Sequence, residues 1–196
     1  MVQGMEQKTS KKVLQLIILD RDGVINQDSR EFIKSPEEWR PLPGSIEAIA
    51  KLSRRGFKVV VATNQSGISR GLFNQAMLDR IHKKMQDAIE AAGGHLDGIF
   101  ICPHGPEDNC ECRKPKPGLL LVIAKQFNLP PEAMLSIGDS MRDLLAAKAS
   151  DIPAILVKTG NGETTLAAHE DKSIPVYRDL AEAADAIIKS YESSKS

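Results

Sequence analysis

The sequence predicts an α/β fold in which helices cover both faces of a parallel sheet, and three features support this prediction. Short β-branched runs alternate along the chain with amphipathic stretches of helical period. Strand, helix and strand follow at a spacing that suits a right-handed parallel crossover. Several of the apolar runs end in polar residues, as strands do where a parallel sheet carries its chemistry. We therefore predict a doubly wound parallel sheet of about five strands, formed by a single domain over residues 1–196.

Local patterns place the elements of this fold. The predicted strands are Val13–Leu19, Phe57–Ala62, Leu96–Ile101, Met134–Ile137 and Ala154–Val157. Helices are predicted from apolar spacing and from start and stop signals: Ser45–Arg55, a long helix from Asn74 to the Gly93–Gly94 pair, Pro117–Phe127, Met141–Ala149 and a last helix from about Asp179. His82, beside the apolar stripe of the long helix, is expected to be structural or solvated. Residues 1–12 and 190–196 are expected to be disordered.

Composition restricts the class of protein. A chain of 196 residues can form one well-buried core. Its 26 basic and 26 acidic residues cancel, so bulk charge gives no indication of nucleic-acid binding. No apolar run approaches the roughly 20 residues of a membrane span, and the polar N-terminus does not resemble a secretory signal. We expect a soluble, cytoplasmic and monomeric protein with neither a nucleic-acid nor a membrane partner.

The first strand ends in two carboxylates, Asp20 and Asp22, followed by Gly23. Residues i and i+2 of an extended segment share a face, so both acids can point into one crevice. Their charges repel there unless a cation lies between them, and Mg²⁺ is the hard cation that suits such a pair. Taken alone, the pattern is equally compatible with an acidic turn after a strand.

Other predicted strand ends supply residues that complete a set. Thr63 follows the second strand, Arg113 and Lys114 follow the third, and Asp139 follows the fourth. Phosphoryl transfer requires positioning and charge neutralisation, which a metal ion, a lysine and hydroxyl donors provide. A carboxylate such as Asp20 can form an aspartyl phosphate. The set therefore indicates phosphoryl transfer, and the absence of a nucleotide-binding glycine loop argues against kinase or hydride chemistry.

All three cysteines lie in one short segment with a histidine, as Cys102, His104, Cys110 and Cys112. Three thiolates and an imidazole match the donor set of a closed structural Zn²⁺ site. Two interpretations remain: a zinc-ordered loop that places Arg113 and Lys114, or free reduced thiols. A catalytic zinc is not expected, because protein ligands would fill all four positions.

Together the motifs resemble those of the haloacid dehalogenase superfamily of phosphatases. The matching segments are Ile17–Gly23, Val60–Thr63, Lys114, and Gly138–Asp139 followed by Asp143. Within this superfamily D-R-D-G-V-I-N, T-N-Q-S-G-I-S-R-G, C-P-H…C-x-C-R-K-P-x-P-G and G-D-S are similar to the subgroup that removes the 7-phosphate of D-glycero-D-manno-heptose 1,7-bisphosphate. The similarity runs from about Leu16 to Gly160. It implies a Rossmann-like fold without a cap domain, a small phosphorylated sugar as substrate, and a place in ADP-heptose and lipopolysaccharide core precursor synthesis.

The resemblance also implies a role for each candidate residue. Asp20 would attack phosphorus, while Asp22 would protonate the leaving sugar oxygen and later accept a proton from water. Mg²⁺ would be held by Asp20, the Asp22 carbonyl and Asp139, and the phosphoryl group by Thr63 and Lys114. The residues expected to contact the substrate are Asp28, Asn64, Gln65, Ser66 and Arg113, with Arg113 suited to a second phosphate. Asp143 is expected either to support the metal site or to be a solvated helix acid.

Departures from other members of the family fall in the substrate-facing loops. The interval between His104 and Cys110 is only five residues, Ser29–Phe32 lacks the His-Gly-Tyr of some members, and Ser140 stands where others have lysine. The nearest alternative is a histidinol-phosphate phosphatase, which is similar in fold, motifs and zinc loop. A non-catalytic phosphosugar-binding module is an alternative from another class, and a polynucleotide 3′-phosphatase is less favoured because no basic groove is evident.

Overall fold

Six parallel strands form one sheet in the order β3-β2-β1-β4-β5-β6. The computed structural model describes residues 14–169, 171 and 173–195. The strands are β1 (Leu16–Leu19), β2 (Lys58–Asn64), β3 (Gly98–Cys102), β4 (Met134–Gly138), β5 (Ala154–Val157) and β6 (Val176–Tyr177). The chain turns from one side of the sheet to the other between β1 and β4, which is where sheets of this topology form a ligand crevice.

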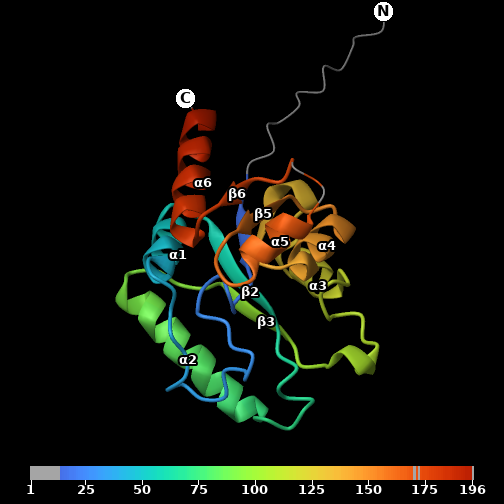
Figure 1. Ribbon diagram of the computed structural model, residues 1–196. Coiled ribbons are helices and arrows are strands. Elements are labelled where there is room, and N and C mark those ends of the chain that lie inside the picture. Colours follow the sequence, from blue (N-terminus) through green and yellow to red (C-terminus); the bar gives the residue numbers. More distant parts are fainter. Residues whose placement is uncertain (1–13, 170, 172, 196) are drawn as a thin grey trace, which may run out of the picture.

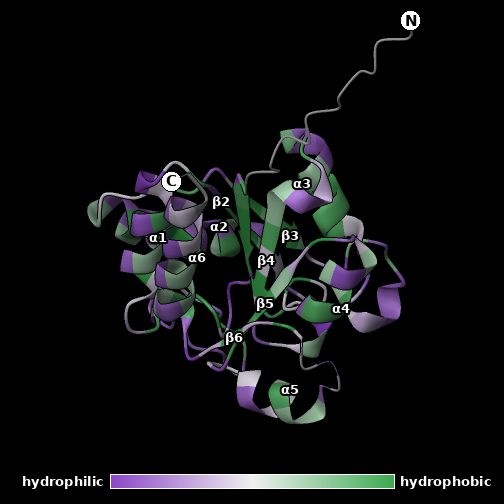
Figure 2. Ribbon diagram, turned by 90° about the horizontal axis from the view of Figure 1, so that it is seen from above, coloured by the Kyte–Doolittle hydropathy of each residue, from purple (hydrophilic) through white to green (hydrophobic). Residues whose placement is uncertain are grey.

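Helices cover both faces of the sheet, and Figures 1 and 2 show the resulting three layers. One face carries α1 (Ser45–Arg54), α2 (Gln75–Ala91) and α6 (Leu180–Lys195). The other face carries α3 (Gly118–Phe127) and α4 (Met141–Ala149). The short helix α5 (Gly162–Ala168) follows β5. The doubly wound architecture predicted from the sequence is therefore confirmed.

The pattern of β1 explains why this layering forms. Its four residues are all apolar and buried, with Ile17 and Leu19 packed into the core under α1, α2 and α6. Leu16 and Ile18 pack into the second core, under α3 and α4. Successive side chains of a strand point to opposite faces, so a continuous apolar run is what a strand buried on both faces requires. The strands accordingly form the hydrophobic centre of the molecule in Figure 2.

The structure differs from the prediction in three places. It adds a sixth strand, β6, and the helix α5, neither of which the sequence pattern indicated. Helix α6 continues to Lys195, so residues 190–195 are helical where disorder was expected. The expectations for residues 1–12 and for Val13 lie outside the described residues.

The connections from β1 to β2 and from β2 to β3 leave the carboxyl edge of the sheet open. Among the described residues these two connections contain α1 and α2 and no additional domain, which agrees with the expectation of a capless fold. None of the described helices combines the length and hydropathy that a bilayer crossing requires.

Candidate active site

Asp20 lies directly beyond β1, at the point where the strand order reverses. Its backbone N–H donates to the Ile137 carbonyl at 3.0 Å, which continues the pairing of β1 with β4. Its side chain is largely buried, and the Lys114 ammonium lies 3.0 Å from Oδ1. Burial raises the pKa of Asp20 to about 7 against the opposing charge of Lys114, and the neighbouring carboxylates add to this rise. The site thus holds a carboxylate whose charged form is stabilised by a cation.

Lys114 is a buried cation at the base of the cavity. Its Nζ donates to the Ala62 carbonyl at 2.7 Å and to Asp143 Oδ1 at 2.5 Å, besides its contact with Asp20. Although burial disfavours the charge, Asp143 and Asp20 raise the pKa of Lys114 above its usual value. The lysine therefore carries a fixed positive charge beside Asp20.

Asn64 fixes the backbone of Lys114. The Asn64 Oδ1 accepts from the Lys114 backbone N–H at 3.1 Å, and Asn64 Nδ2 donates to the Lys114 carbonyl at 3.0 Å. Asn64 lines the cavity, as expected of a substrate-binding residue. Its amide nevertheless already pairs with the lysine backbone, so it joins the end of β2 to the loop that carries the cation.

Asp143 is buried rather than solvated, so the solvated helix acid considered from the sequence is wrong. Its Oδ1 accepts from Lys114, and its Oδ2 accepts from the Ser140 backbone N–H at 3.0 Å and from Ser140 Oγ at 2.6 Å. Burial opposes its ionisation, but Lys114 and Ser140 together lower its pKa. Asp143 thus anchors the lysine from the first turn of α4.

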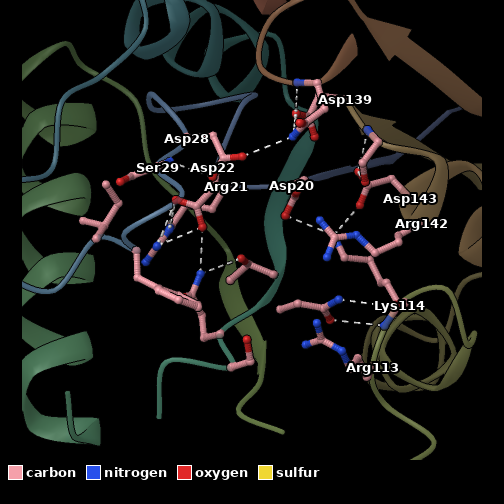
Figure 3. Close-up of a pocket in the computed structure, with 18 of the residues that line it drawn as sticks. Asp20, Arg21, Asp22, Asp28, Ser29, Arg113, Lys114, Asp139, Arg142 and Asp143 are labelled. Atoms are coloured by element: carbon pink, nitrogen blue, oxygen red, sulfur yellow. Dashed lines mark hydrogen bonds and ion pairs between the residues drawn. The ribbon is translucent and has the colours of Figure 1, made fainter. Parts of the chain in front are cut away.

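Asp22 is held by hydrogen bonds on both carboxylate oxygens. Arg21 Nη2 lies 2.9 Å from each oxygen, Asn26 Nδ2 donates to Oδ1 at 2.9 Å, and Gln65 Nε2 donates to Oδ2 at 2.9 Å. Burial disfavours the carboxylate, yet Arg21 and these donors together lower the pKa of Asp22. Asp22 therefore rests as an ionised group at the cavity wall (Figure 3).

Asp139 occupies a narrow space between two glycines. A Cβ at Gly23 would lie 2.1 Å from Asp139 Oδ2, and one at Gly160 would lie 2.2 Å from the same atom. Asn161 donates to Oδ2 from its backbone N–H at 2.7 Å and from Nδ2 at 3.2 Å. Burial raises the pKa of Asp139 to about 6, against these hydrogen bonds. Its other oxygen, Oδ1, has no hydrogen bond in the part of the chain that the structure describes.

These acids form a donor set that fits a hard cation. Ligand oxygens of Asp20, Asp139 and Asp143 lie within 4.8 Å of one another. Oxygen donors of this kind suit Mg²⁺. Burial raises the pKa of both Asp20 and Asp139, and a bound cation would favour the ionised forms that ligate it. Both oxygens of Asp143 already pair with Lys114 or Ser140. Asp20 and Asp139 are therefore the better placed side-chain ligands.

The remaining predicted residues line the same cavity, which has a volume of about 390 Å³. Thr63 is buried, and its Oγ1 accepts from Gln65 Nε2 at 2.9 Å, which leaves the hydroxyl proton to donate. Ser66 and Asp28 also line the cavity, and Asp28 Oδ2 accepts from Asn161 Nδ2 at 3.1 Å. The structure thus brings every predicted catalytic, substrate-binding and magnesium-site residue to one cavity (Figure 3).

The sequence interpretation missed several residues of the cavity rim. Arg70 and Arg142 join the predicted Arg113 there, and Phe32 adds an aromatic wall with the Arg70 guanidinium 5.6 Å from its ring centroid. Arg113 Nη1 donates to the His104 carbonyl at 2.9 Å. Arg70 stands within a motif noted in the sequence, but neither it nor Arg142 directly follows a strand, so strand-end reasoning had no signal for them.

The cysteines and His104 form a compact cluster next to this rim. Sulfur–sulfur distances are 3.1 Å for Cys102–Cys112, 3.6 Å for Cys102–Cys110 and 3.5 Å for Cys110–Cys112. His104 Nδ1 lies 3.4 Å from the Cys112 sulfur. Thiolates around a tetrahedral zinc lie about 3.8 Å apart, given Zn–S bonds of about 2.3 Å. The four donors therefore fit one zinc ion with only a small expansion.

Comparisons of the sequence and of the structure with known proteins agree on one family. The family model of haloacid dehalogenase-like hydrolases matches residues 5–151. The D-glycero-beta-D-manno-heptose-1,7-bisphosphate 7-phosphatase of Bordetella bronchiseptica is 50% identical over 177 residues, covering 90% of this chain and 99% of the relative. Its counterpart from Pseudomonas aeruginosa is 47% identical over 174 residues, covering 89% and 98%. A crystal structure of the B. bronchiseptica D,D-heptose 1,7-bisphosphate phosphatase, complexed with magnesium and phosphate, aligns with a TM-score of 0.88 at 49% identity and covers 90% of this chain and 99% of that one.

Proposed function

The chain belongs to the haloacid dehalogenase-like hydrolases and is a phosphoric monoester hydrolase, and we propose that it removes the 7-phosphate of D-glycero-β-D-manno-heptose 1,7-bisphosphate. One observation carries the proposal: the buried Asp20–Lys114 pair lies in the same cavity as a rim of arginines. A bisphosphate needs a reaction centre for one phosphate and separate cations for the other. The β anomer follows the names of the relatives. The reaction would supply heptose 1-phosphate for ADP-heptose and the lipopolysaccharide core, in the cytoplasm.

In the proposed reaction Asp20 attacks the phosphorus of the 7-phosphate. The bond between phosphorus and the sugar oxygen breaks, and Asp22 gives its proton to that oxygen, which leaves an aspartyl phosphate. Water then attacks this phosphorus and Asp22 takes the proton of the water. The bond between phosphorus and the Asp20 oxygen breaks, so that free Asp20 is restored and inorganic phosphate departs. Lys114 and the Thr63 hydroxyl hold the phosphoryl oxygens throughout. The resting Asp22 is ionised, which is the form that acts as base. To act as acid it first takes up a proton from solvent, and we expect this uptake to accompany binding of the phosphate dianion.

We assign the magnesium site to Asp20, the Asp22 carbonyl and Asp139. Support comes from the cluster of carboxylate oxygens and from the magnesium in the crystal structure of the B. bronchiseptica relative. When bound, Mg²⁺ supplies positive charge that reduces the repulsion between the nucleophile and the phosphoryl oxygens. The protein residues keep Asp139 in place for this role, through the Asn161 donors and the two flanking glycines.

We assign Cys102, His104, Cys110 and Cys112 to a structural zinc ion. The donor distances and the Cys₃His composition support this assignment. The loop that the ion would order leads directly into Arg113 and Lys114, and Arg113 is also bonded to the His104 carbonyl. The loop therefore sets the position of both cations.

The substrate would lie between the reaction centre and the rim. Gln65 and Ser66 follow β2, and both line the cavity together with Asp28, so these three can contact the sugar hydroxyls. Arg113 is placed to bind the 1-phosphate. Because the fold has no cap, these loop residues carry the selectivity.

A direct test compares substrates with the purified, magnesium-loaded protein. We expect kcat/KM for the β-heptose bisphosphate to exceed that for histidinol phosphate by about a hundredfold or more, because histidinol phosphate lacks the second phosphate. The α anomer serves as a further comparison. A clear preference for histidinol phosphate would refute the substrate assignment, and Asp20→Asn with full activity would refute the mechanism.

A matched pair of variants tests the second-phosphate site. Arg113→Gln is expected to raise KM for the bisphosphate about tenfold while leaving 4-nitrophenyl phosphate hydrolysis nearly unchanged, since the small ester has no second phosphate. Lys116→Gln removes a nearby cation that pairs with Glu111 instead of lining the cavity, and it should have neither effect.

A further inference from the structure

Arg21 is a buried arginine between the two acids of the D-R-D motif, and nothing in the proposed reaction uses it. Its side chain is only 1% exposed. Nη2 lies 2.9 Å from each oxygen of Asp22, and Nε lies 3.1 Å from Oδ1. A planar guanidinium in this bidentate contact fixes the rotation of the carboxylate as well as neutralising its charge.

The other end of this guanidinium contacts His82 of α2. Arg21 Nη1 lies 3.2 Å from His82 Nε2, and the histidine is 6% exposed. Burial lowers the pKa of His82 to about 4, and the Arg21 charge adds to this effect against Asp22 and Asp79, so the ring is neutral. Its Nε2 therefore accepts the Arg21 hydrogen bond. His82 thus fulfils the expectation of a structural residue, but its partner belongs to the active site.

A neutral histidine adds no charge compensation to Arg21, which Asp22 already pairs with. What His82 adds is a second fixed point for the guanidinium plane, from an element distant in the sequence. On the other side of Asp22, Asn26 and Gln65 donate to the carboxylate, and Asn26 is itself fixed by the Trp39 indole N–H at 3.0 Å. Each contact restricts the same carboxylate from a different direction.

We propose that Arg21 and His82 are positioning residues that hold Asp22 in the orientation for proton transfer to the leaving oxygen of the substrate. The inference rests on the proposed acid–base role of Asp22. A proton donor that is displaced by a fraction of its hydrogen-bond length loses much of its effect, whereas phosphate binding at Lys114 and Thr63 is unaffected. Loss of His82 should therefore slow proton delivery selectively.

The test uses two leaving groups, because only one of them needs a proton. A sugar phosphate releases an unstable alkoxide unless its leaving oxygen receives a proton, while 4-nitrophenyl phosphate releases a stable phenolate. The parameter kcat/KM covers only the steps up to departure of the leaving group, so it excludes the later action of Asp22 as a base. For His82→Leu we expect kcat/KM on the sugar phosphate to fall about tenfold, and that on 4-nitrophenyl phosphate to stay within about twofold.

Four further variants make the result specific. His82→Gln keeps an acceptor for Arg21 and should recover most of the lost activity, and Arg21→Lys should show the same selective loss as His82→Leu. Ile81→Val removes one methyl group from a buried side chain of the same helix outside this network, and it should change kcat/KM for neither substrate. Asp22→Asn gives the reference selectivity for complete loss of the acid.

Two results would overturn the inference, and they differ in meaning. Equal losses on both substrates in His82→Leu, alongside a selective loss in Asp22→Asn, would show that the pair only stabilises the fold. No selectivity in Asp22→Asn would remove the acid role itself, and the positioning role would fall together with that part of the proposed function.

Discussion

At Gly23 the backbone and the neighbouring Asp139 both exclude a side chain. Its φ is +85°, which L-residues adopt only at a cost of about 1–2 kcal/mol, and a Cβ would lie 2.1 Å from Asp139 Oδ2. We therefore expect Gly23→Ala to displace this proposed metal ligand. The variant should lower the free energy of unfolding by about 2 kcal/mol or more and raise the Mg²⁺ concentration needed for half-maximal activity.

Gly56→Ala separates the two effects of Gly23→Ala. Gly56 has almost the same φ, +87°, but no atom lies within 4 Å of the position that a Cβ would take, so only the backbone cost applies. Urea unfolding should show a loss of about 1 kcal/mol for Gly56→Ala with unchanged magnesium dependence. If both variants give the same magnesium dependence, the close packing of Gly23 on Asp139 does not contribute to magnesium binding.

His82 makes stability depend on pH in a defined window. Burial holds its pKa at about 4 in the folded protein against 6.5 in an unfolded chain, with Arg21 adding to the shift. Below pH 6.5 the unfolded chain gains a proton that the folded protein does not accept until about pH 4, so stability falls as pH falls through this window. Between pH 7 and pH 5 the loss should be about 2 kcal/mol.

The measurement is urea unfolding of the protein and of His82→Gln at both pH values. Glutamine does not titrate, so the variant should lose less stability over the same interval by about that amount. His95→Gln is the control, since His95 is exposed on the surface. Parallel pH dependences for the protein and His82→Gln would contradict the neutral, buried state of His82.

At the scale of elements, we expect the loop between β3 and α3 to depend on its four candidate metal donors for order. Between Cys102, the last residue of β3, and Cys112, the only regular structure is one turn of 3₁₀ helix at Pro106–Asp108, and the buried apolar contribution comes from Cys102. We expect one zinc per chain by elemental analysis. Cys112→Ser should lose the zinc, lower the melting temperature and reduce kcat about tenfold or more, because Lys114 follows two residues later.

Glu111→Gln is the matched control for this loop. Its carboxylate is exposed, pairs with Lys116 at 2.9 Å and is not a metal donor of the cluster, so zinc content and kcat should not change. Full activity of a Cys112→Ser protein that lacks zinc would show that Lys114 is held without the ion, by contacts such as those with Asn64 and Asp143.

The elements found from the sequence are those whose own residues determine them. β1 is a continuous apolar run, and β2 and β4 are largely apolar and buried. Helix α2 follows Asn74, whose side chain accepts from the Met77 backbone N–H at 2.9 Å as a cap. Helix α5 has only seven residues, with a glycine and two threonines, so its propensity is poor. It depends on tertiary contacts such as Thr165 Oγ1 donating to the Asp139 carbonyl at 2.9 Å. β6 has only two residues, too few for a periodic signal.

The features of the site also fall into those that the sequence predicts and those that it does not. Asp20, Thr63, Lys114 and Asp139 were predictable because the carboxyl ends of parallel strands, and the loops after them, meet at one edge. The direction in which each side chain points was not predictable. Asn64 turns to the Lys114 backbone, fifty positions along the chain, and His82 contacts Arg21 from α2. Contacts between distant positions leave no periodic pattern in one sequence, and the same holds for Arg142 at the rim.

At the scale of the whole molecule, the proposed catalytic residues of one chain already line a common cavity, so we expect activity without a second copy. The large apolar side chains exposed on the described surface are only Leu72, Leu121, Val122 and Leu145. A stable dimer buries about 800 Å² on each partner with an apolar centre, which four such side chains supply poorly. We therefore predict a monomer, with a mass near 21.4 kDa by size-exclusion chromatography with light scattering.

Activity measured at increasing dilution tests the same prediction. Specific activity should stay constant as enzyme concentration falls well below the range used for light scattering, because no dissociation step precedes catalysis. The double variant Leu121→Ser with Val122→Ser, on the outer side of α3, should elute and react like the parent. Two results together would contradict this prediction: a dimeric mass that the double variant abolishes, and activity that is lost on dilution. They would show that a second chain stabilises α3 and also, through the loop that precedes α3, the position of Lys114.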